Sequence, residues 1–340
     1  MAGQASRWRY DAKTQCEQSH ERGIALKICY IGAGNFSNTF IYPQLARHEV
    51  ELAAVCDLVE EKAQAAAAMY GFEKVYTDFE KMLDEQQPDA VFCIGAKNMH
   101  YTVGMQVIER GFPVYVQKPP AATVEQTREM AALAEAKKTV CHVGFNMRSS
   151  GAVAMTKKLL EGDEFGAPTL LICRYGLFAG KTWWAGIHDQ HCHAIDAVLY
   201  LLGGVASVHV EPLPAEGVRG YVAAMVMENG AVATLNTTSE QDMRDEFFYF
   251  EVTGRGKHCV ISHDGDLRYH RPEGDDLCLR AGTYFPSRLL DHFGYVSDVA
   301  NFLAAARGEE ADRCPVGDTI GTMELVDEIY RQCRERGGPE

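Results

Sequence analysis

The stretch ALKICYIGAGNFSNTF, residues 25–40, passes from an apolar run of strand length into two closely spaced glycines and then into a helical pattern. Gly32 and Gly34 permit a tight turn and let an anion approach the backbone at a helix N-terminus, where N–H groups attract it. In the usual Gly-x-Gly-x-x-Gly pattern the third glycine is replaced here by Ser37, so the motif alone is weak. The fold therefore has to be predicted from the segments that flank this motif.

Those surroundings alternate apolar runs of strand length with helical patterns through the first 145 residues. Further runs are VELAAVCD (50–57), DAVFCIG (89–95), PVYVQ (113–117) and TVCHVGF (139–145). Helices are predicted near 36–47, 59–70, 101–111 and 123–137. Such alternation is typical of an α/β fold with a doubly wound parallel sheet, which binds ligands at the carboxyl ends of its strands.

Asp57 lies at the end of the second apolar run, 25 residues after Gly32. A carboxylate at this place can accept hydrogen bonds from both hydroxyls of an adenosine ribose, and it would repel a 2′-phosphate. The pattern therefore favours NAD over NADP. The alternative is a glycine turn followed by an aspartate that caps a helix.

After Arg148 the pattern changes to closely spaced strand candidates separated by Gly, Asn and Asp turns, which predicts a mostly antiparallel sheet. The candidates lie within 167–176, 205–213, 221–230, 231–239, 247–254 and 257–270, and helices are predicted at 152–162, 190–203, 288–306 and 318–335. We therefore divide the chain into a loose N-terminal arm (1–25), a dinucleotide-binding domain (26–147) and a second α/β domain (148–340).

The bulk composition excludes several classes of function. The net charge is −14 and no basic stripe is present, so nucleic acid is not a predicted partner. No segment approaches the ~20 apolar residues of a membrane span, and the first residues lack the apolar core of a signal peptide. Several of the 11 cysteines lie in apolar runs without Cys-x-x-Cys spacing, as reduced thiols do. A cytoplasmic protein is expected.

Two further segments carry residues suited to catalysis. In VYVQKPPAA (114–122), a charged Lys118 ends a run that reads as a buried strand, so a polar group has to meet it. In WWAGIHDQHCHAIDAVLYLLGG (183–204), Asp189 and His193 are four residues apart, and an imidazole beside a carboxylate suits proton transfer with a hydroxyl. Together with His188 and His191 they also allow a metal site, and a purely structural histidine is a further alternative.

In order along the chain, five segments resemble the Gfo/Idh/MocA family, named after glucose–fructose oxidoreductase, inositol dehydrogenase and a rhizopine catabolism protein. They are YIGAGNFSNTF, VCDLVEEKA, KNMHYTVGMQVIERGFPVYVQKPPA, GFNMR and DQHCHAIDAVLYLLG, and the resemblance covers about residues 26–335. It implies a Rossmann domain followed by a substrate-binding and oligomerisation domain with a large open sheet, whose outer face forms homodimers or homotetramers.

The resemblance also implies NAD(P)-dependent oxidation or reduction at a carbinol or keto carbon of a sugar, inositol or related polyol. It assigns proton transfer to His193, orientation of its ring to Asp189 and stabilisation of the alkoxide to Lys118, with no metal. Cofactor contacts are expected at Gly32, Gly34, Asn35, Phe36, Asp57, Asn98, His100, Gln117 and Lys118. Substrate contacts are expected at Asn146, Arg148, Trp183, Trp184 and His193; for Arg148 an ion pair with an acid, and for the tryptophans core packing, are the alternatives.

Two departures from the family pattern concern the reaction itself. The family's Glu-Lys-Pro glutamate is Gln117, which removes a negative charge beside Lys118, and the glycine of Asp-x-Gly-x-His is His191. Two rival functions stay open at this point. One is a glycoside hydrolase that uses transient oxidation by bound NAD, and the other is a non-enzymatic sensor that binds a dinucleotide.

Overall fold

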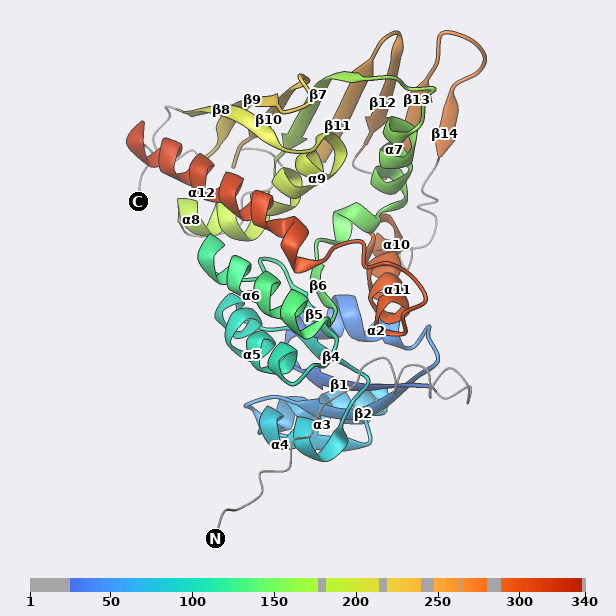
Figure 1. Cartoon of the computed structure of the whole chain (residues 1–340), viewed down its shortest axis with the longest axis vertical. Coiled ribbons are helices and arrows are strands. Elements are labelled where there is room, and N and C mark those ends of the chain that lie inside the picture. Colours follow the sequence, from blue (N-terminus) through green and yellow to red (C-terminus); the bar gives the residue numbers. More distant parts are fainter. Residues whose placement is uncertain are drawn as a thin grey trace. The chain divides into compact units, whose positions relative to one another are not determined.

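The computed structural model describes residues 25–176, 182–213, 219–239, 248–262, 265–279 and 289–337. The chain forms two compact units (Figure 1). The first ends at Val143 and also includes Val299–Gly317, and the second comprises Gly144–Asp298 and the chain from Asp318 onward. Apart from Ala25, the predicted N-terminal arm lies outside the described residues.

A six-stranded sheet forms the centre of the first unit, with the order β3-β2-β1-β4-β5-β6. The pairs β1–β2, β1–β4, β2–β3 and β4–β5 are parallel, so the predicted doubly wound sheet is confirmed. β4, β5 and β6 are buried along their whole length, as expected of parallel strands covered on both faces. The strands are β1 Leu26–Ile31, β2 Val50–Cys56, β3 Lys74–Tyr76, β4 Ala90–Cys93, β5 Val114–Gln117 and β6 Cys141–Gly144.

Helices connect these strands, and their starts follow local capping chemistry. Asp78 accepts hydrogen bonds from the N–H groups of Glu80 and Lys81, and Thr123 accepts one from Gln126. The short β3 and the helix after it were not predicted. The helical elements are a π-helical turn Ser37–Ile41 with α2 Tyr42–Leu45, then α3 Glu60–Tyr70, α4 Phe79–Gln86, α5 Lys97–Glu109 and α6 Val124–Lys137.

The segment Val299–Gly317 belongs to the first unit because its side chains complete that core. The Phe302 ring lies 5.0 Å from Phe92 and 5.6 Å from Tyr115, between ring centroids. His142 Nδ1 lies 2.7 Å from Asp312 Oδ1, and both residues belong to this unit. The chain thus returns to the first sheet after most of the second unit has been completed.

The second unit is built on an eight-stranded sheet with the order β14-β13-β12-β11-β7-β10-β9-β8. Neighbouring strands are antiparallel except for the parallel pair β7–β10, so the predicted mostly antiparallel sheet is confirmed. The strands are β7 Pro168–Tyr175, β8 Val205–Pro212, β9 Tyr221–Met227, β10 Val232–Thr237, β11 Phe248–Gly254, β12 Lys257–Ile261, β13 Leu267–His270 and β14 Leu277–Leu279.

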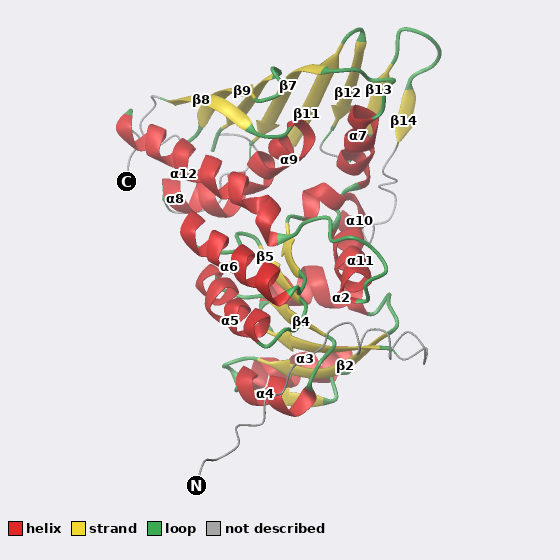
Figure 2. Ribbon diagram, in the orientation of Figure 1, coloured by secondary structure: helices red, strands yellow, loops and turns green. Residues whose placement is uncertain are grey.

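Helices cover one face of this sheet (Figure 2). α9 contacts β7 and β10, α12 contacts β8, and α7 contacts β12. The strands alternate buried and exposed residues, and the exposed face carries Val222, Val226 and Val232. The helices of this unit are α7 Gly151–Glu161, α8 Trp183–Gly186, α9 Cys192–Leu202, α10 Leu289–His292 and α12 Ile320–Glu335, with α11 Tyr295–Ala306 crossing from the second unit into the first. None of the helices in the described part of the chain has the length and apolar character that crossing a membrane requires.

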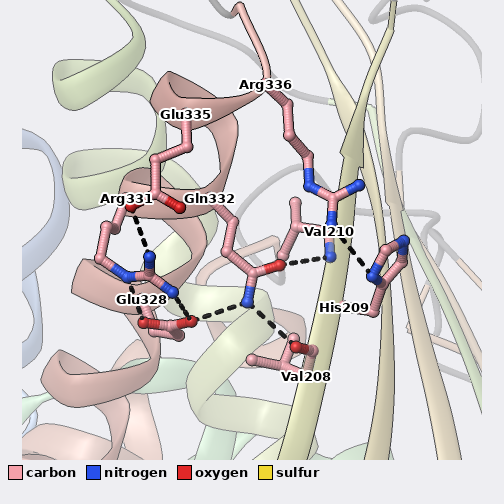
Figure 3. Close-up of polar contacts among 8 residues, drawn as sticks. All are labelled: Val208, His209, Val210, Glu328, Arg331, Gln332, Glu335 and Arg336. Carbon is pink, nitrogen blue, oxygen red and sulfur yellow. Dashed lines mark hydrogen bonds and ion pairs between the residues drawn. The ribbon is translucent and has the colours of Figure 1, made fainter.

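The edge strand β8 is hydrogen-bonded by one side chain of α12 (Figure 3). Gln332 Oε1 accepts the Val210 N–H at 2.8 Å, and its Nε2 donates to the Val208 carbonyl at 3.0 Å and to Glu328 Oε1 at 2.7 Å. The Gln332 amide thus takes the place of the peptide group that a further strand would offer. An unpaired edge is a site of unwanted association, and this contact satisfies two of the backbone groups along it, the Val210 N–H and the Val208 carbonyl.

We predict that Gln332→Leu lowers the free energy of unfolding by about 2 kcal/mol, because the buried backbone groups of β8 lose their partner. Urea denaturation followed by circular dichroism measures this loss. The control is Arg331→Ala on the same helix, which removes exposed ion pairs to Glu328 and Glu335 and should leave the midpoint close to that of the wild type. Equal destabilisation by both variants would contradict the assignment.

Candidate functional site

The turn after β1 has the backbone that a dinucleotide requires. Gly32 has a φ of +107°, and a Cβ built there would lie 1.9 Å from the carbonyl oxygen of Ile94, so no side chain fits. A Cβ at Gly34 would meet no atom within 4 Å, so the chain leaves space above this turn. Helical backbone begins at Asn35, and the first N–H groups of a helix have no partner within it. The turn therefore fits the pyrophosphate of NAD.

Asp57 closes this turn from the end of β2. Its Oδ2 accepts the Ala33 N–H at 2.7 Å, and its Oδ1 accepts the Val59 N–H at 2.9 Å. A carboxylate has about four lone-pair sites, so two backbone donors leave capacity for ribose hydroxyls. The structure thus gives Asp57 a structural contact with the glycine turn that the sequence did not reveal.

His100 connects two loops at the carboxyl edge of the first sheet. Gly95 N–H donates to His100 Nε2 at 3.2 Å, so the ring proton is on Nδ1, which contacts the Pro119 carbonyl oxygen at 2.9 Å. The side chain is 2% exposed. Burial lowers the pKa of His100 to about 4, with a smaller lowering by the nearby charge of Lys118, although the backbone hydrogen bonds oppose it. The ring is therefore neutral at physiological pH and holds the Lys118–Pro119 segment against the loop after β4.

The other residues predicted to contact the cofactor are arranged along the same unit. Asn35 and Asn98 are exposed, and Phe36 is half-buried with its ring 4.9 Å from that of Phe40. Gln117 is 5% exposed at the end of β5, and its Oε1 accepts the Lys118 N–H at 2.7 Å. Lys118 follows directly, so the end of β5 carries a buried amide next to a cation.

Asp189 and His193 lie in one continuous helical stretch of the second unit. The residues Ile187–His191 form a π-helical turn between α8 and α9, so the helix begins at Trp183, earlier than the predicted 190. Asp189 is in the π turn and His193 is in the first turn of α9. His188 Nδ1 contacts Asp189 Oδ1 at 3.4 Å, and the side chain of Asp189 is 40% exposed. π turns are frequent at functional sites.

The three histidines of this stretch have different surroundings. His188 is buried with its ring 4.4 Å from that of Trp184, and His191 is buried with Nδ1 3.1 Å from the Tyr221 hydroxyl. The ring of His193 lies edge-on to Phe145, with 6.2 Å between the centroids. Within the described residues, no three His, Cys, Asp or Glu side chains are grouped so that they could hold a metal ion.

Arg148 is an internal ion-pair partner in the second unit. Its Nε and Nη2 donate to Asp196 Oδ2 and Oδ1 at 2.8 and 2.6 Å, and Thr322 donates to the same carboxylate. Arg148 is 6% exposed and Asp196 is fully buried. The sequence left two interpretations of Arg148 open, a contact with substrate and an ion pair with an acid. The structure contains the ion pair.

The remaining residues predicted to contact substrate are also partly engaged. Asn146 is buried and donates from Nδ2 to the Phe293 carbonyl at 2.6 Å. Trp183 is 2% exposed, as a core residue is, whereas Trp184 is half-buried and contacts His188 and Tyr330. A separate cavity of about 880 Å³ is lined by parts of α7, α9, β8 and α12, and Arg148 is the predicted site residue that reaches it.

Comparisons with known proteins agree with this geometry. Residues 26–145 match the model of an oxidoreductase family with an NAD-binding Rossmann fold, GFO_IDH_MocA. The chain is 30% identical over 190 residues to D-glucoside 3-dehydrogenase of Escherichia coli, which is 52% of this chain and 54% of that protein. It is 23% identical over 329 residues to D-apiose dehydrogenase of Paraburkholderia graminis, with 91% and 88% covered.

A solved structure extends the likeness to both units. The crystal structure of a dehydrogenase from Chromobacterium violaceum has a TM-score of 0.80 at 20% identity, and the match covers 91% of this chain and 95% of that one. At this identity the likeness shows the fold: a nucleotide turn at the head of a doubly wound sheet, followed by a second unit on a large open sheet. Residues 26–145 thus resemble the NAD-binding domain of the Gfo/Idh/MocA oxidoreductases.

The buried neutral His100 predicts a loss of stability in acid. An unfolded chain protonates this residue near its ordinary pKa of 6.5, whereas the folded pKa is about 4, so its stabilisation is complete above pH 6.5 and is lost as the pH falls towards 4. Over this range the wild type should lose about 3 kcal/mol of unfolding free energy that His100→Gln does not lose. Urea titrations at several pH values measure both slopes, and identical slopes would refute the interpretation.

The two contacts of Asp57 predict different effects for two substitutions. Asp57→Asn keeps one acceptor oxygen for Ala33 but removes the charge, so it should raise the affinity for NADP⁺ relative to NAD⁺ by about tenfold. Asp57→Ala also removes the tether of the turn and should weaken the binding of both cofactors. Calorimetric titration with each cofactor tests this, and an unchanged ratio in Asp57→Asn would exclude Asp57 as the discriminating residue.

Proposed function

We propose that this protein transfers hydride between NAD and a carbinol or keto carbon of a sugar, an inositol or a related polyol. The observation that carries the proposal is the glycine turn with Asp57, placed on the same sheet edge as the His100-anchored Lys118 segment. The relatives named above as D-glucoside 3-dehydrogenase and D-apiose dehydrogenase support the substrate class. The glycoside hydrolase and the sensor have no specific observation in their favour.

The proposed chemistry divides the work between cofactor and protein. NAD, when bound, supplies the hydride acceptor. His193 takes the proton of the substrate hydroxyl as general base, and the Lys118 ammonium stabilises the negative charge that develops on the oxygen. Asp189 acts electrostatically on the imidazole of His193. The Asp189 carboxylate also contacts the ring of His188. In reduction these residues act in the opposite direction.

The packing of the other candidates suggests how their roles differ. We assign Gly32, Gly34, Asn35 and Phe36 to the turn that binds the cofactor. Asn98, at the start of α5, is also assigned to cofactor binding. His100 is a positioning residue, because both of its ring nitrogens contact backbone groups of the protein. Arg148 and Trp183 are assigned to packing in the second unit, since both are buried. Asn146 and Trp184 are assigned to substrate binding.

The proposal includes the partners and the compartment. The exposed valines of β9 and β10 give the open sheet face an apolar surface suited to a homodimer or homotetramer. Nine of the ten cysteines in the described residues are buried, and burial raises the pKa of Cys93 to about 12, which fits inert thiols in the reducing cytoplasm. The net charge of −14 makes a nucleic-acid partner unfavourable.

We expect Lys118→Ala and His193→Ala each to lower kcat at least about a hundredfold while the Kd for NADH changes little. The lost interactions act on the reacting oxygen, not on cofactor affinity. Matched controls are Lys137→Ala and His270→Ala, which remove exposed members of surface ion pairs and should retain activity. Near-normal kcat in either of the first two variants would refute its assigned role.

The decisive test of the function begins with mass spectrometry of the denatured, purified protein to identify bound nucleotide. It continues with NADH absorbance during incubation with a panel of sugars, inositols and their keto forms. Substrate-dependent change in bulk NADH supports the proposal and begins to name the substrate. Bound NAD with cleavage of glycosides and no net change in NADH would replace it with the hydrolase, and bound NAD without any turnover would favour the sensor.

A further inference from the structure

Gln117, the last residue of β5, carries an amide whose two ends have different surroundings. Its Oε1 accepts the Lys118 N–H at 2.7 Å. Because a backbone N–H can only donate, this contact fixes the amide oxygen on that side and the amide nitrogen on the other. Nε2 is buried and has no hydrogen-bond partner among the described residues, although Gln117 is only 5% exposed. Buried donors of this kind are usually met by an acceptor, which water or a bound ligand can supply where the chain does not.

The strand order indicates which part of the cofactor lies near this donor. The order reverses between β1 and β4, and a doubly wound sheet binds a dinucleotide across that reversal, with one mononucleotide half on each side. Asp57, at the end of β2, marks the adenosine side. The carboxyl end of β5, where Gln117 lies, is on the opposite side of the reversal and therefore belongs to the nicotinamide half.

We propose that Gln117 presents a neutral hydrogen-bond donor to the nicotinamide half of NAD, and that its lack of charge sets the relative affinity for oxidised and reduced cofactor. This inference rests on the proposed function. The nicotinamide ring is cationic when oxidised and neutral when reduced. A carboxylate at position 117 would favour the cationic ring, whereas an amide does not. Glutamine in place of the family's glutamate thus shifts the relative affinity towards the reduced cofactor and away from tight retention of NAD⁺.

The test compares the full chain with its Gln117→Glu variant without substrate, so the readout is binding and not activity. NADH is titrated by its fluorescence, and NAD⁺ by competition against NADH. The ratio Kd(NAD⁺)/Kd(NADH) should fall by about tenfold or more in Gln117→Glu. Burial raises the pKa of a carboxyl group, so the titrations are made at about pH 7 and about pH 9, with the larger effect at the higher pH.

Two further variants separate the charge from the hydrogen bond. Gln117→Met keeps the length of the side chain but removes the donor, together with the oxygen that accepts the Lys118 N–H, so both Kd values should rise by about fivefold or more while their ratio stays constant. Gln87→Glu adds the same charge at an exposed residue just before β4, at the amino edge of the sheet, and should leave the ratio unchanged because of distance and screening.

The outcomes distinguish this inference from the proposed function. If the wild type binds both cofactor forms but Gln117→Glu has the wild-type ratio at both pH values, the inference is overturned and the proposed function stands. If Gln117→Glu does not fold, as judged by circular dichroism, unchanged affinities in Gln117→Met overturn the inference instead. Failure of the wild type to bind either form would refute the proposed function itself.

Discussion

The close approach of Ile94 to Gly32 is the constraint on which the ligand-binding edge depends. With the Ile94 carbonyl oxygen 1.9 Å from where a Cβ would lie, β1 can only end in a glycine at this place. The resulting turn directs the chain across the end of the sheet, where the Ala33 N–H meets Asp57 at the end of β2. On the other side of the reversal in strand order, His100 joins the loop after β4 to the segment after β5. One steric requirement thus fixes the turn, and hydrogen bonds from neighbouring strands hold the two sides of the edge in register.

The sequence predicted the elements whose side chains repeat regularly, and it failed where structure depends on contacts far along the chain. The parallel strands and most of the second sheet were predicted from apolar runs and turn residues. The short strands β3 and β14 have only three residues each, too few for a period to be recognised. The return of Val299–Gly317 to the first unit was not predicted, because its cause is the packing of Phe302 on rings that lie about two hundred residues earlier. The π turn at Ile187–His191 was missed because a single turn of this kind inserts only one residue into an otherwise regular helical pattern.

The candidate site divides in the same way. Glycine, aspartate and lysine at strand ends carry meaning in the sequence because a core strand does not need them. The partners of these residues carry no such signal. Nothing in the sequence indicates that His100 spans Gly95 and Pro119, or that Arg148 pairs with Asp196 and shares that carboxylate with Thr322. Such pairs depend on where two elements meet in space, which the local pattern of residues does not encode.

The two departures from the family pattern have different physical consequences. His191 replaces a glycine, but its ring is fully buried and contacts the Tyr221 hydroxyl, so it ties the π turn to β9 within the second unit. The polar ring that replaces the glycine thus has a hydrogen-bond partner within the protein. Gln117 replaces a glutamate, and only half of its amide is met by the protein, since Oε1 contacts the chain while Nε2 does not. Buried polar groups are mostly hydrogen-bonded to protein or water, so a buried donor at the ligand-binding edge can be completed by a ligand. Of the two, Gln117 is therefore the departure that we propose acts on what the site binds, whereas His191 acts on how the helix that carries His193 is held.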